Sequence, residues 1–307
     1  MARMAFCNGN IPVGFGSART TRKCGAACLD ENFKPLPGSY HGPMLSRGGK
    51  NGYLCPDCVR RFYDITEDGD TSGYSWENSL RRGKVSEKQS RLPFQMTVSQ
   101  ELEMMRPTLR TALEVQANDY ILTGDCTVNL EAKSPIYYGR QSIAKYADTI
   151  ERLISEGDMA ITSDCGTHTH FGAVFTDRPD EEAINVFFMA WLRQEEVYKA
   201  LIKPIADILR EHETETARFF GRSLGGWADY PDFWSPTSHG NFINVQHDHT
   251  VEIRLPRFRN AAQYRRFLEY GEAVIREILA CYYSEEKNTE KAGKRLAKLT
   301  RKYVIDD

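Results

Sequence analysis

Polar residues separated by one position recur on three stretches of the chain with apolar residues around them, residues 95–105, 165–175 and 250–256. Alternate residues of a β-strand point to the same face, and two steps along a strand cover about 6.6–6.8 Å. Each stretch therefore predicts a strand that aims one polar pair toward a single face, and in the first and third the opposite face is apolar. The polar pairs are Glu101 with Glu103, His168 with His170, and Glu252 with Arg254. The pattern predicts a sheet with one face packed on a core and the other lined by carboxylates, imidazoles and a guanidinium.

Helical spacing of apolar residues appears between these strands and after them. It predicts a helix over residues 143–157, which Gly157 ends, and a second over residues 180–203. Pro204 should interrupt that second helix, and a further stretch runs toward residue 220. A long amphipathic helix over residues 264–282 follows the third strand. The alternation of strands and helices favours an α+β fold.

The composition of the chain divides it into four segments. Residues 1–64 are rich in Gly, Pro and Cys, and residues 65–93 are polar, as in a linker or a mobile arm. Residues 94–285 hold the strands and helices of the main domain. Residues 286–307 form a basic tail, for which a solvated or frayed helix is favoured over binding to an acidic partner. Inside the main domain, the aperiodic residues 221–244 are long enough to predict a lid or a substrate wall.

Charge and hydropathy exclude several classes of protein. The 307 residues are 41% hydrophobic and 27% charged with a net charge of −2, which is typical of a globular protein, and we expect no nucleic-acid partner. No apolar run approaches the roughly 20 residues that a membrane span needs, and the N-terminus lacks a long apolar segment for secretion. We therefore expect a cytoplasmic protein that does not bind membranes.

Four of the eight cysteines form two close pairs, Cys24 with Cys28 and Cys55 with Cys58. Tetrahedral structural zinc takes four thiolate or imidazole ligands, and a short spacing lets one turn supply two of them. We expect these four cysteines to bind a structural Zn²⁺, with Cys7 or His41 as substitutes for one ligand. The alternatives are free, partly buried cysteines, or a zinc module that recognises a partner. A segment this small has too little core to fold well alone, so the metal would supply much of its stability.

The carboxylates of the strand pairs indicate a metal site. Carboxylates that face one another repel unless a cation lies between them, and Mg²⁺ prefers such hard oxygen ligands. Simpler interpretations stay open for each pair: a solvated strand face, structural histidines or a transition-metal site, and a cross-strand ion pair. His247 and His249 form a further pair, but they flank a turn, and we favour no function for them.

Four motifs in fixed order carry a resemblance to a known family: residues 100–103, 124–135, 164–170 and 250–255. Together they resemble the amidoligase family, a branch of the glutamine synthetase-like carboxylate–amine ligases, over roughly residues 94–285. The family usually carries Gly before the Glu-x-Glu of its first motif, whereas this chain has Val98, Ser99 and Gln100 there. Its Asp-Gly-Ser element appears here as Asp125 followed by Cys126 and Thr127, which leaves the role of Asp125 open.

The resemblance implies a curved antiparallel sheet with helices on one face. The cysteine pairs add to it the expectation of a small N-terminal zinc-binding domain. The concave face of the sheet would hold ATP and Mg²⁺. By motif matching the magnesium ligands would be Glu101, Glu103, Glu131, His168 and Glu252. His170 and Asn244 would lie near the nucleotide, and Arg254 would meet the transferring phosphoryl group. Arg254, Glu252 and Glu103 would be the catalytic residues.

The function implied is that of an ATP-dependent ligase that joins a carboxylate to an amine through an acyl phosphate. The product would be an amide or isopeptide bond, and the substrates could belong to a protein, a peptide or a metabolite. Two alternatives stay open: an inactive ligase-like zinc adaptor, and a guanidino or amine phosphotransferase on the same scaffold. The sequence leaves the oligomeric state open.

Overall fold

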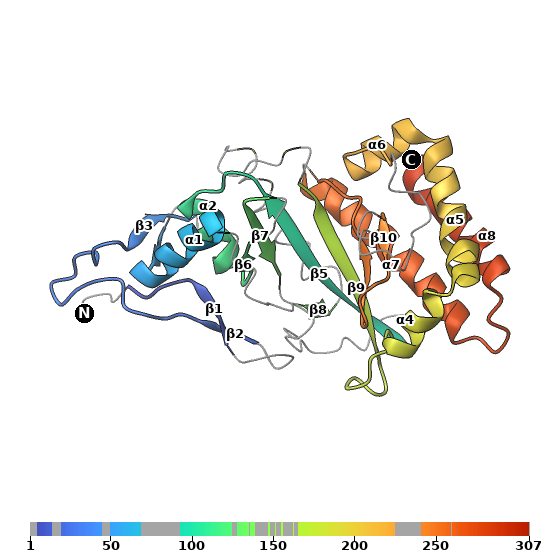
Figure 1. Ribbon diagram of the computed structural model, residues 1–307, viewed down its shortest axis with the longest axis horizontal. Coiled ribbons are helices and arrows are strands. Elements are labelled where there is room, and N and C mark those ends of the chain that lie inside the picture. The colour runs from blue at the N-terminus through green and yellow to red at the C-terminus, as the bar shows by residue number, and fades with distance from the viewer. Residues whose placement is uncertain are drawn as a thin grey trace. The chain divides into compact units, whose positions relative to one another are not determined.

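The computed structural model describes residues 5–13, 20–44, 50–68, 93–124, 128–134, 136–138, 165–224, 241–258 and 260–306, with residues 147, 151, 155 and 162 (Figure 1). Helices and antiparallel strand pairs make up these residues, which confirms the predicted α+β class. The chain forms two compact units. Unit 1 comprises Met1–Arg81, Gln100–Ile136 and Lys145–Cys165, and unit 2 comprises Arg82–Ser99, Tyr137–Ala144 and Gly166–Asp307. No helix in the described residues is both long and apolar enough to span a bilayer.

Unit 1 consists of short antiparallel strand pairs and two described helices. Its elements are β1 (Asn10–Val13), β2 (Thr20–Lys23), β3 (Tyr40–Pro43), β4 (Asn51–Leu54), α1 (Pro56–Asp68), α2 (Leu109–Ala117), β6 (Ile121–Thr123) and β7 (Leu130–Lys133). Strand β1 pairs with β2, and β3 pairs with β4. Strand β7 pairs with β6 on one side and with residues 101–104 of β5 (Phe94–Met104) on the other.

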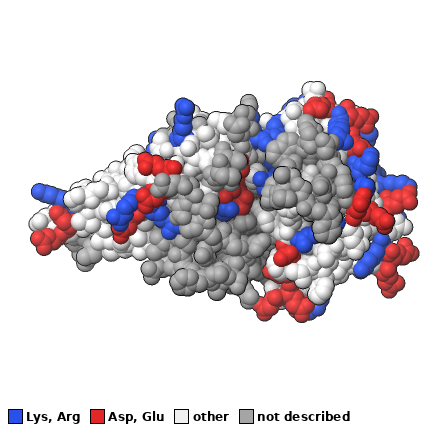
Figure 2. Space-filling view, viewed as in Figure 1, with Lys and Arg blue, Asp and Glu red and all other residues white. Residues whose placement is uncertain are grey.

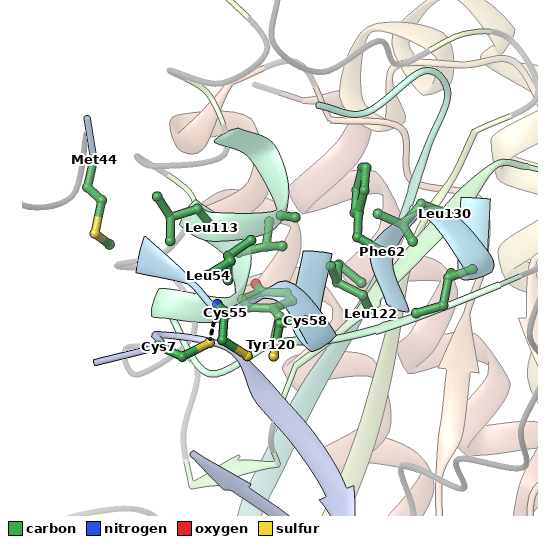
Figure 3. Packing of buried hydrophobic residues seen from close by; sticks show 14 of the residues in the cluster. Cys7, Met44, Leu54, Cys55, Cys58, Phe62, Leu113, Tyr120, Leu122 and Leu130 are labelled. Atoms are coloured by element: carbon green, nitrogen blue, oxygen red, sulfur yellow. Dashed lines mark hydrogen bonds between the residues drawn. The ribbon is translucent and has the colours of Figure 1, made fainter. Parts of the chain in front are cut away.

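The core of unit 1 joins the cysteine-rich segment to later parts of the chain. Leu54 and Phe62 belong to the same buried cluster as Leu113, Leu122 and Leu130 (Figure 3). Hydrogen bonds reinforce this packing, because Asn10 Nδ2 donates to the carbonyls of Gln116 at 3.0 Å and Tyr120 at 3.1 Å. Residues 5–65 therefore share a core with residues 102–132 instead of forming one of their own.

Unit 2 is an antiparallel sheet with a long helix on one face. Its elements are residues 94–99 of β5, then β8 (Tyr137–Tyr138), β9 (Thr167–Phe175), α4 (Val186–Leu192), α5 (Glu195–Glu211), α6 (Glu213–Phe220), β10 (Ile243–Asn244), β11 (Val251–Ile253), α7 (Ala261–Tyr282) and α8 (Thr289–Thr300). Strands β10, β11, β9 and β5 are hydrogen-bonded in that order, and β8 also pairs with β5. Helix α7 approaches β9 closely at Gly271, where a Cβ would lie 2.3 Å from Phe171 Cζ.

The helix expected over residues 180–203 has other bounds. It begins after Asn185, whose side chain accepts hydrogen bonds from the backbone N–H groups of Phe187 and Phe188. Helix α4 ends at Leu192, and after two non-helical residues α5 begins at Glu195. Helix α5 runs through Pro204 instead of ending there. The prediction of a break at Pro204 was wrong because Leu201, Ile205 and neighbouring residues are buried on both sides of it. Burial there outweighs the one helical hydrogen bond that proline cannot donate.

The C-terminal segment is packed against the body of unit 2. Helix α8 and the π-helical turn Arg301–Ile305 follow the amphipathic helix α7, with Leu296 and Val304 buried. A Cβ on Gly293 would lie 2.1 Å from the carbonyl oxygen of Ala200, so α8 runs close to α5. Acidic and basic side chains alternate over these helices (Figure 2). Basic side chains of the segment pair with acidic ones, as Arg295 does with Glu277.

Several predicted features lie outside the described residues. They are the linker from residue 69 to residue 92, most of the helix over residues 143–157, the loop from residue 225 to residue 240, and Asp125. The linker was expected to begin at residue 65, but α1 extends to Asp68.

Candidate active site

Glu252 lies at the centre of a polar group on the sheet of unit 2. Its neighbours along β11, Val251 and Ile253, are buried and apolar, so the alternation predicted from sequence holds there. The register places Glu252 opposite His170 of β9 on one side and opposite Asn244 of β10 on the other. Three adjacent strands thus bring one polar side chain each to the same row of the sheet.

Both carboxylate oxygens of Glu252 accept hydrogen bonds. Arg254 Nη1 donates to Oε1 at 2.8 Å, and Asn244 Nδ2 donates to Oε2 at 2.8 Å. His247 Nε2 also lies 3.1 Å from Oε2. Since the Glu252 side chain is fully buried, these contacts take the place of solvent.

Two further imidazoles complete this group. His168 Nδ1 lies 3.4 Å from Glu252 Oε1, and His170 Nε2 lies 3.8 Å from the same oxygen. The ring of His170 meets that of His247 edge-on, with centroids 4.9 Å apart. We call Asn244, His168, His170, His247, Glu252 and Arg254 the Glu252 cluster.

The Glu252 cluster keeps its central carboxyl group ionised. Burial acts to raise the pKa of Glu252, but the charge of His170, the hydrogen bond with His247 and the charge of Arg254 together lower it below the usual range. The cluster therefore combines one buried anion with several imidazole and guanidinium donors. Such donors suit the recognition of a phosphate group.

The loop that carries His247 is held by a residue distant in sequence. Arg193, directly after α4, donates from Nε to the carbonyl of Val245 at 2.7 Å. Its Nη2 donates to the carbonyls of Gln246 at 2.7 Å and His247 at 2.6 Å. The guanidinium thus fixes the backbone between β10 and β11. His249 faces elsewhere, with Nδ1 2.5 Å from Glu182 Oε2.

A second polar group lies on the sheet of unit 1. Register places Glu101 opposite Lys133 and Glu103 opposite Glu131, across β5 and β7. The residues Glu101, Glu103 and Glu131 are only 7%, 6% and 5% exposed. A carboxylate oxygen of Glu103 lies within 4.8 Å of one of Glu131. We call Glu101, Glu103, Glu131 and Lys133 the Glu131 cluster.

Lys133 supplies a cation to this cluster. Its Nζ lies 2.8 Å from Glu131 Oε2 and 3.0 Å from Glu101 Oε1, and Thr123 Oγ1 also donates to Glu131 Oε2 at 3.3 Å. Burial and the charge of Glu101 nevertheless raise the pKa of Glu131 well above its usual value. For Lys133, burial lowers the pKa, but the charges of Glu101 and Glu131 more than offset it and raise the pKa. The ammonium group of Lys133 therefore does not offset the effect of burial and of the neighbouring Glu101 on the pKa of Glu131.

A comparison with models of protein families shows the family of the chain. Residues 86–260, more than half of the chain, match the model of the family described as putative amidoligase enzyme. The chain belongs to the amidoligase family. No curated protein matches it.

The amidoligase match includes every residue of the Glu252 and Glu131 clusters. From the sequence, all of them except Lys133 and His247 were given a role, and no function was favoured for His247. Lys133 carried a usable signal, because it lies two residues after Glu131 and so on the same face of the strand. For His247 the only signal was its pairing with His249, which does not place it beside Glu252, because the loop position depends on the contacts of Arg193.

The four predicted zinc ligands, Cys24, Cys28, Cys55 and Cys58, lie outside the amidoligase match. The structure gathers the Sγ atoms of Cys7, Cys24, Cys55 and Cys58 within 4.8 Å of one another. Three of the four predicted ligands are in this group, and the fourth place belongs to Cys7, one of the expected substitutes. His41, the other substitute, stacks on Tyr53 with ring centroids 4.7 Å apart.

Proposed function

We propose that this amidoligase is an ATP-dependent ligase that joins a carboxylate to an amine through an acyl phosphate. The observation that carries the proposal is the Glu252–Arg254 pair, in which a buried carboxylate holds a guanidinium through a 2.8 Å hydrogen bond. Carboxylate–amine ligation by ATP needs a fixed cation for the transferring phosphoryl group, because negative charge is concentrated there in the transition state.

Arg254 has the geometry to contact a phosphate. A guanidinium has five N–H donors in a planar fork, and Glu252 accepts from one nitrogen. The Arg254 side chain is 21% exposed, so a ligand can reach it, whereas Glu252 is not accessible. We assign Arg254 to the transferring phosphoryl group, and we assign His170 and Asn244 to the nucleotide. In this proposal Glu252 orients Arg254, Asn244 and His247.

The Glu131 cluster fits magnesium by its donor chemistry. Glu101, Glu103 and Glu131 provide hard oxygen ligands, and the register brings Glu103 and Glu131 opposite each other. Family resemblance adds His168 and Glu252 to the ligand set. Glu252 fits less well, since its oxygens already accept from Arg254 and Asn244. Bound Mg²⁺ would neutralise the charge of the ATP phosphates.

The proposed reaction has two steps. An oxygen of the substrate carboxylate attacks the γ-phosphorus of ATP, and ADP leaves, which gives the acyl phosphate. The amine nitrogen then attacks the acyl carbon, phosphate leaves, and the nitrogen loses a proton. We assign Glu103 to accept that proton, because the family resemblance makes it a catalytic residue. Exclusion of water protects the acyl phosphate from hydrolysis.

A substrate screen tests this function. Purified protein is incubated with ATP, Mg²⁺, amino acids, polyamines and acidic peptides, and both ADP release and new adducts by mass spectrometry are recorded. The proposal expects ADP and phosphate in equal amounts, with an adduct that has the mass of acid plus amine less one water. Release of AMP, or an adduct that carries phosphate on the amine, contradicts it.

The metal assignment has a separate test. ATP binding should depend on Mg²⁺ in the wild type, and Glu103→Gln should weaken that dependence while the protein stays folded. A matched control is Glu114→Gln, another buried glutamate of unit 1, which lies on α2 outside the Glu131 cluster. Tight ATP binding that ignores both Mg²⁺ and Glu103→Gln would show that these carboxylates do not hold the metal.

A further inference from the structure

The four clustered cysteines have the spacing of a tetrahedral thiolate site. Zinc binds thiolates at about 2.3 Å, which separates two sulfurs of a tetrahedron by roughly 3.8 Å. Cys24 Sγ lies 3.7 Å from Cys55 Sγ, and the sulfurs of Cys7 and Cys58 belong to the same group within 4.8 Å. A disulfide would need about 2.05 Å between sulfurs, so Cys24 and Cys55 are not bonded to each other.

Two elements bring these sulfurs together, the base of the β1–β2 strand pair and the start of helix α1. Cys7 and Cys24 flank the β1–β2 pair, and backbone hydrogen bonds from Cys24 to Gly9 at 2.7 Å and from Cys7 to Ala26 at 2.8 Å close its base. Cys55 directly precedes α1, and Cys58 lies in the first turn of that helix. The strand pair and the helix start thus supply two sulfurs each, and about 30 residues separate Cys24 from Cys55.

The backbone around the sulfurs is adapted to thiolates. Cys7 Sγ accepts hydrogen bonds from the N–H groups of Cys55 at 3.2 Å and Gly9 at 3.3 Å, and Figure 3 shows the first of these. Gly9 also provides space, since a Cβ there would lie 2.7 Å from Cys58 Sγ and 3.2 Å from Cys7 Sγ. Hydrogen bonds to the ligand atoms orient metal ligands and hold their charge.

We propose that Cys7, Cys24, Cys55 and Cys58 bind one structural zinc ion, and that Cys28 is not a ligand. Cys28 is fully buried, and its thiol lies 3.7 Å from the carbonyl of Ala26, outside the group of four. Four soft sulfur ligands match a closed, four-coordinate zinc site, which leaves no position for a substrate. None of its ligands belongs to either cluster, so the zinc takes no direct part in the proposed ligase chemistry.

The zinc would join the β1–β2 pair to α1 and thereby stabilise the core of unit 1. Cys7, Cys55 and Cys58 belong to the buried cluster that contains Leu102 and Met104 of β5. Those two residues alternate along the strand with Glu101 and Glu103. Loss of zinc should therefore loosen the strand segment that carries two residues of the Glu131 cluster.

Metal analysis of cysteine variants of the full chain tests the site. Wild type purified after expression with zinc should contain about one zinc per chain by elemental analysis, and Cys28→Ser should keep it. Cys7→Ser and Cys58→Ser should bind much less zinc. No stoichiometric zinc in the wild type, or retention in Cys7→Ser with loss in Cys28→Ser, would overturn the proposal.

Cobalt substitution keeps the test decisive if a variant folds poorly. Wild type and Cys28→Ser loaded with Co²⁺ should both give the absorption bands of a tetrahedral four-thiolate complex. Titration with Zn²⁺ should abolish the bands as the metal exchanges. Bands typical of fewer thiolates in the wild type, or bands that change in Cys28→Ser, would contradict the assigned ligand set.

Discussion

Lys133 and Glu131 lie two residues apart on β7, and Lys133 Nζ is 2.8 Å from Glu131 Oε2. The same ammonium group contacts Glu101 on the neighbouring strand at 3.0 Å. From their sequence pattern these carboxylates were expected to need a bound cation, and the chain itself supplies part of the positive charge. A metal at this cluster would therefore share the carboxylates with a lysine.

Removal of the lysine charge should destabilise the protein. Lys133→Met leaves Glu101 and Glu131 without their cation in a buried setting, and we expect a loss of roughly 3–5 kcal/mol in the free energy of unfolding. Urea denaturation measures it, and added Mg²⁺ should restore part of the loss. Lys294→Met, which breaks the exposed pair with Glu290, is the control and should cost at most about 1 kcal/mol. Equal stability of both variants would refute a charge-compensating role for Lys133.

The effect of Glu252 on stability should depend on pH. Because its folded-state pKa is lowered, the ionised carboxylate stabilises the fold above its unfolded pKa of about 4.3, and this contribution is lost as pH falls toward the folded value. The difference in unfolding free energy between wild type and Glu252→Gln should therefore be largest near neutral pH and shrink below about pH 4. A difference that stays constant through this range would mean that the charge of Glu252 is not what the cluster stabilises.

The contacts of Arg193 with the His247 loop predict an effect on turnover. Arg193→Met removes donors to three backbone carbonyls, and loss of such supporting contacts commonly lowers activity by about 10–100-fold. The rate of ADP release measures the effect, with thermal melting to confirm folding. Lys199→Met, which removes an exposed pair with Glu195, is the matched control and should leave the rate unchanged. Normal turnover in Arg193→Met would exclude His247 from the reaction.

Arg254 should matter for the reaction more than for ATP binding. Arg254→Lys keeps the positive charge but loses the planar fork, so we expect turnover to fall by roughly 10²–10³-fold while ATP affinity changes little. Arg178→Lys, at an exposed ion pair with Glu181, serves as the control. A lysine variant with full activity would make Arg254 only the ion-pair partner of Glu252.

The features that could be predicted from the sequence are those that depend on local periodicity. The paired residues Glu101 and Glu103 share a strand face, and so do Glu252 and Arg254, because the period of a strand is two. The amphipathic pattern likewise gave α7. These signals need no knowledge of the fold.

The parts that sequence missed depend on contacts between distant residues. His247 is positioned by Arg193, which lies 54 residues away. Cys7 joins the cysteine group because the β1–β2 pair returns the chain to its start, whereas spacing alone favoured Cys28. Pro204 remains helical because the residues around it are buried, which a propensity argument does not include.

The transfer of ¹⁸O from the substrate carboxylate is the most direct test of the central claim. The carboxylate found by the substrate screen is labelled in both oxygens, and the released phosphate is analysed by mass spectrometry. The account predicts that one label moves into the phosphate, because an acid oxygen attacks the γ-phosphorus. Label that stays wholly in the acid, with phosphate found on the amine or guanidine, would contradict the ligase mechanism and indicate a kinase.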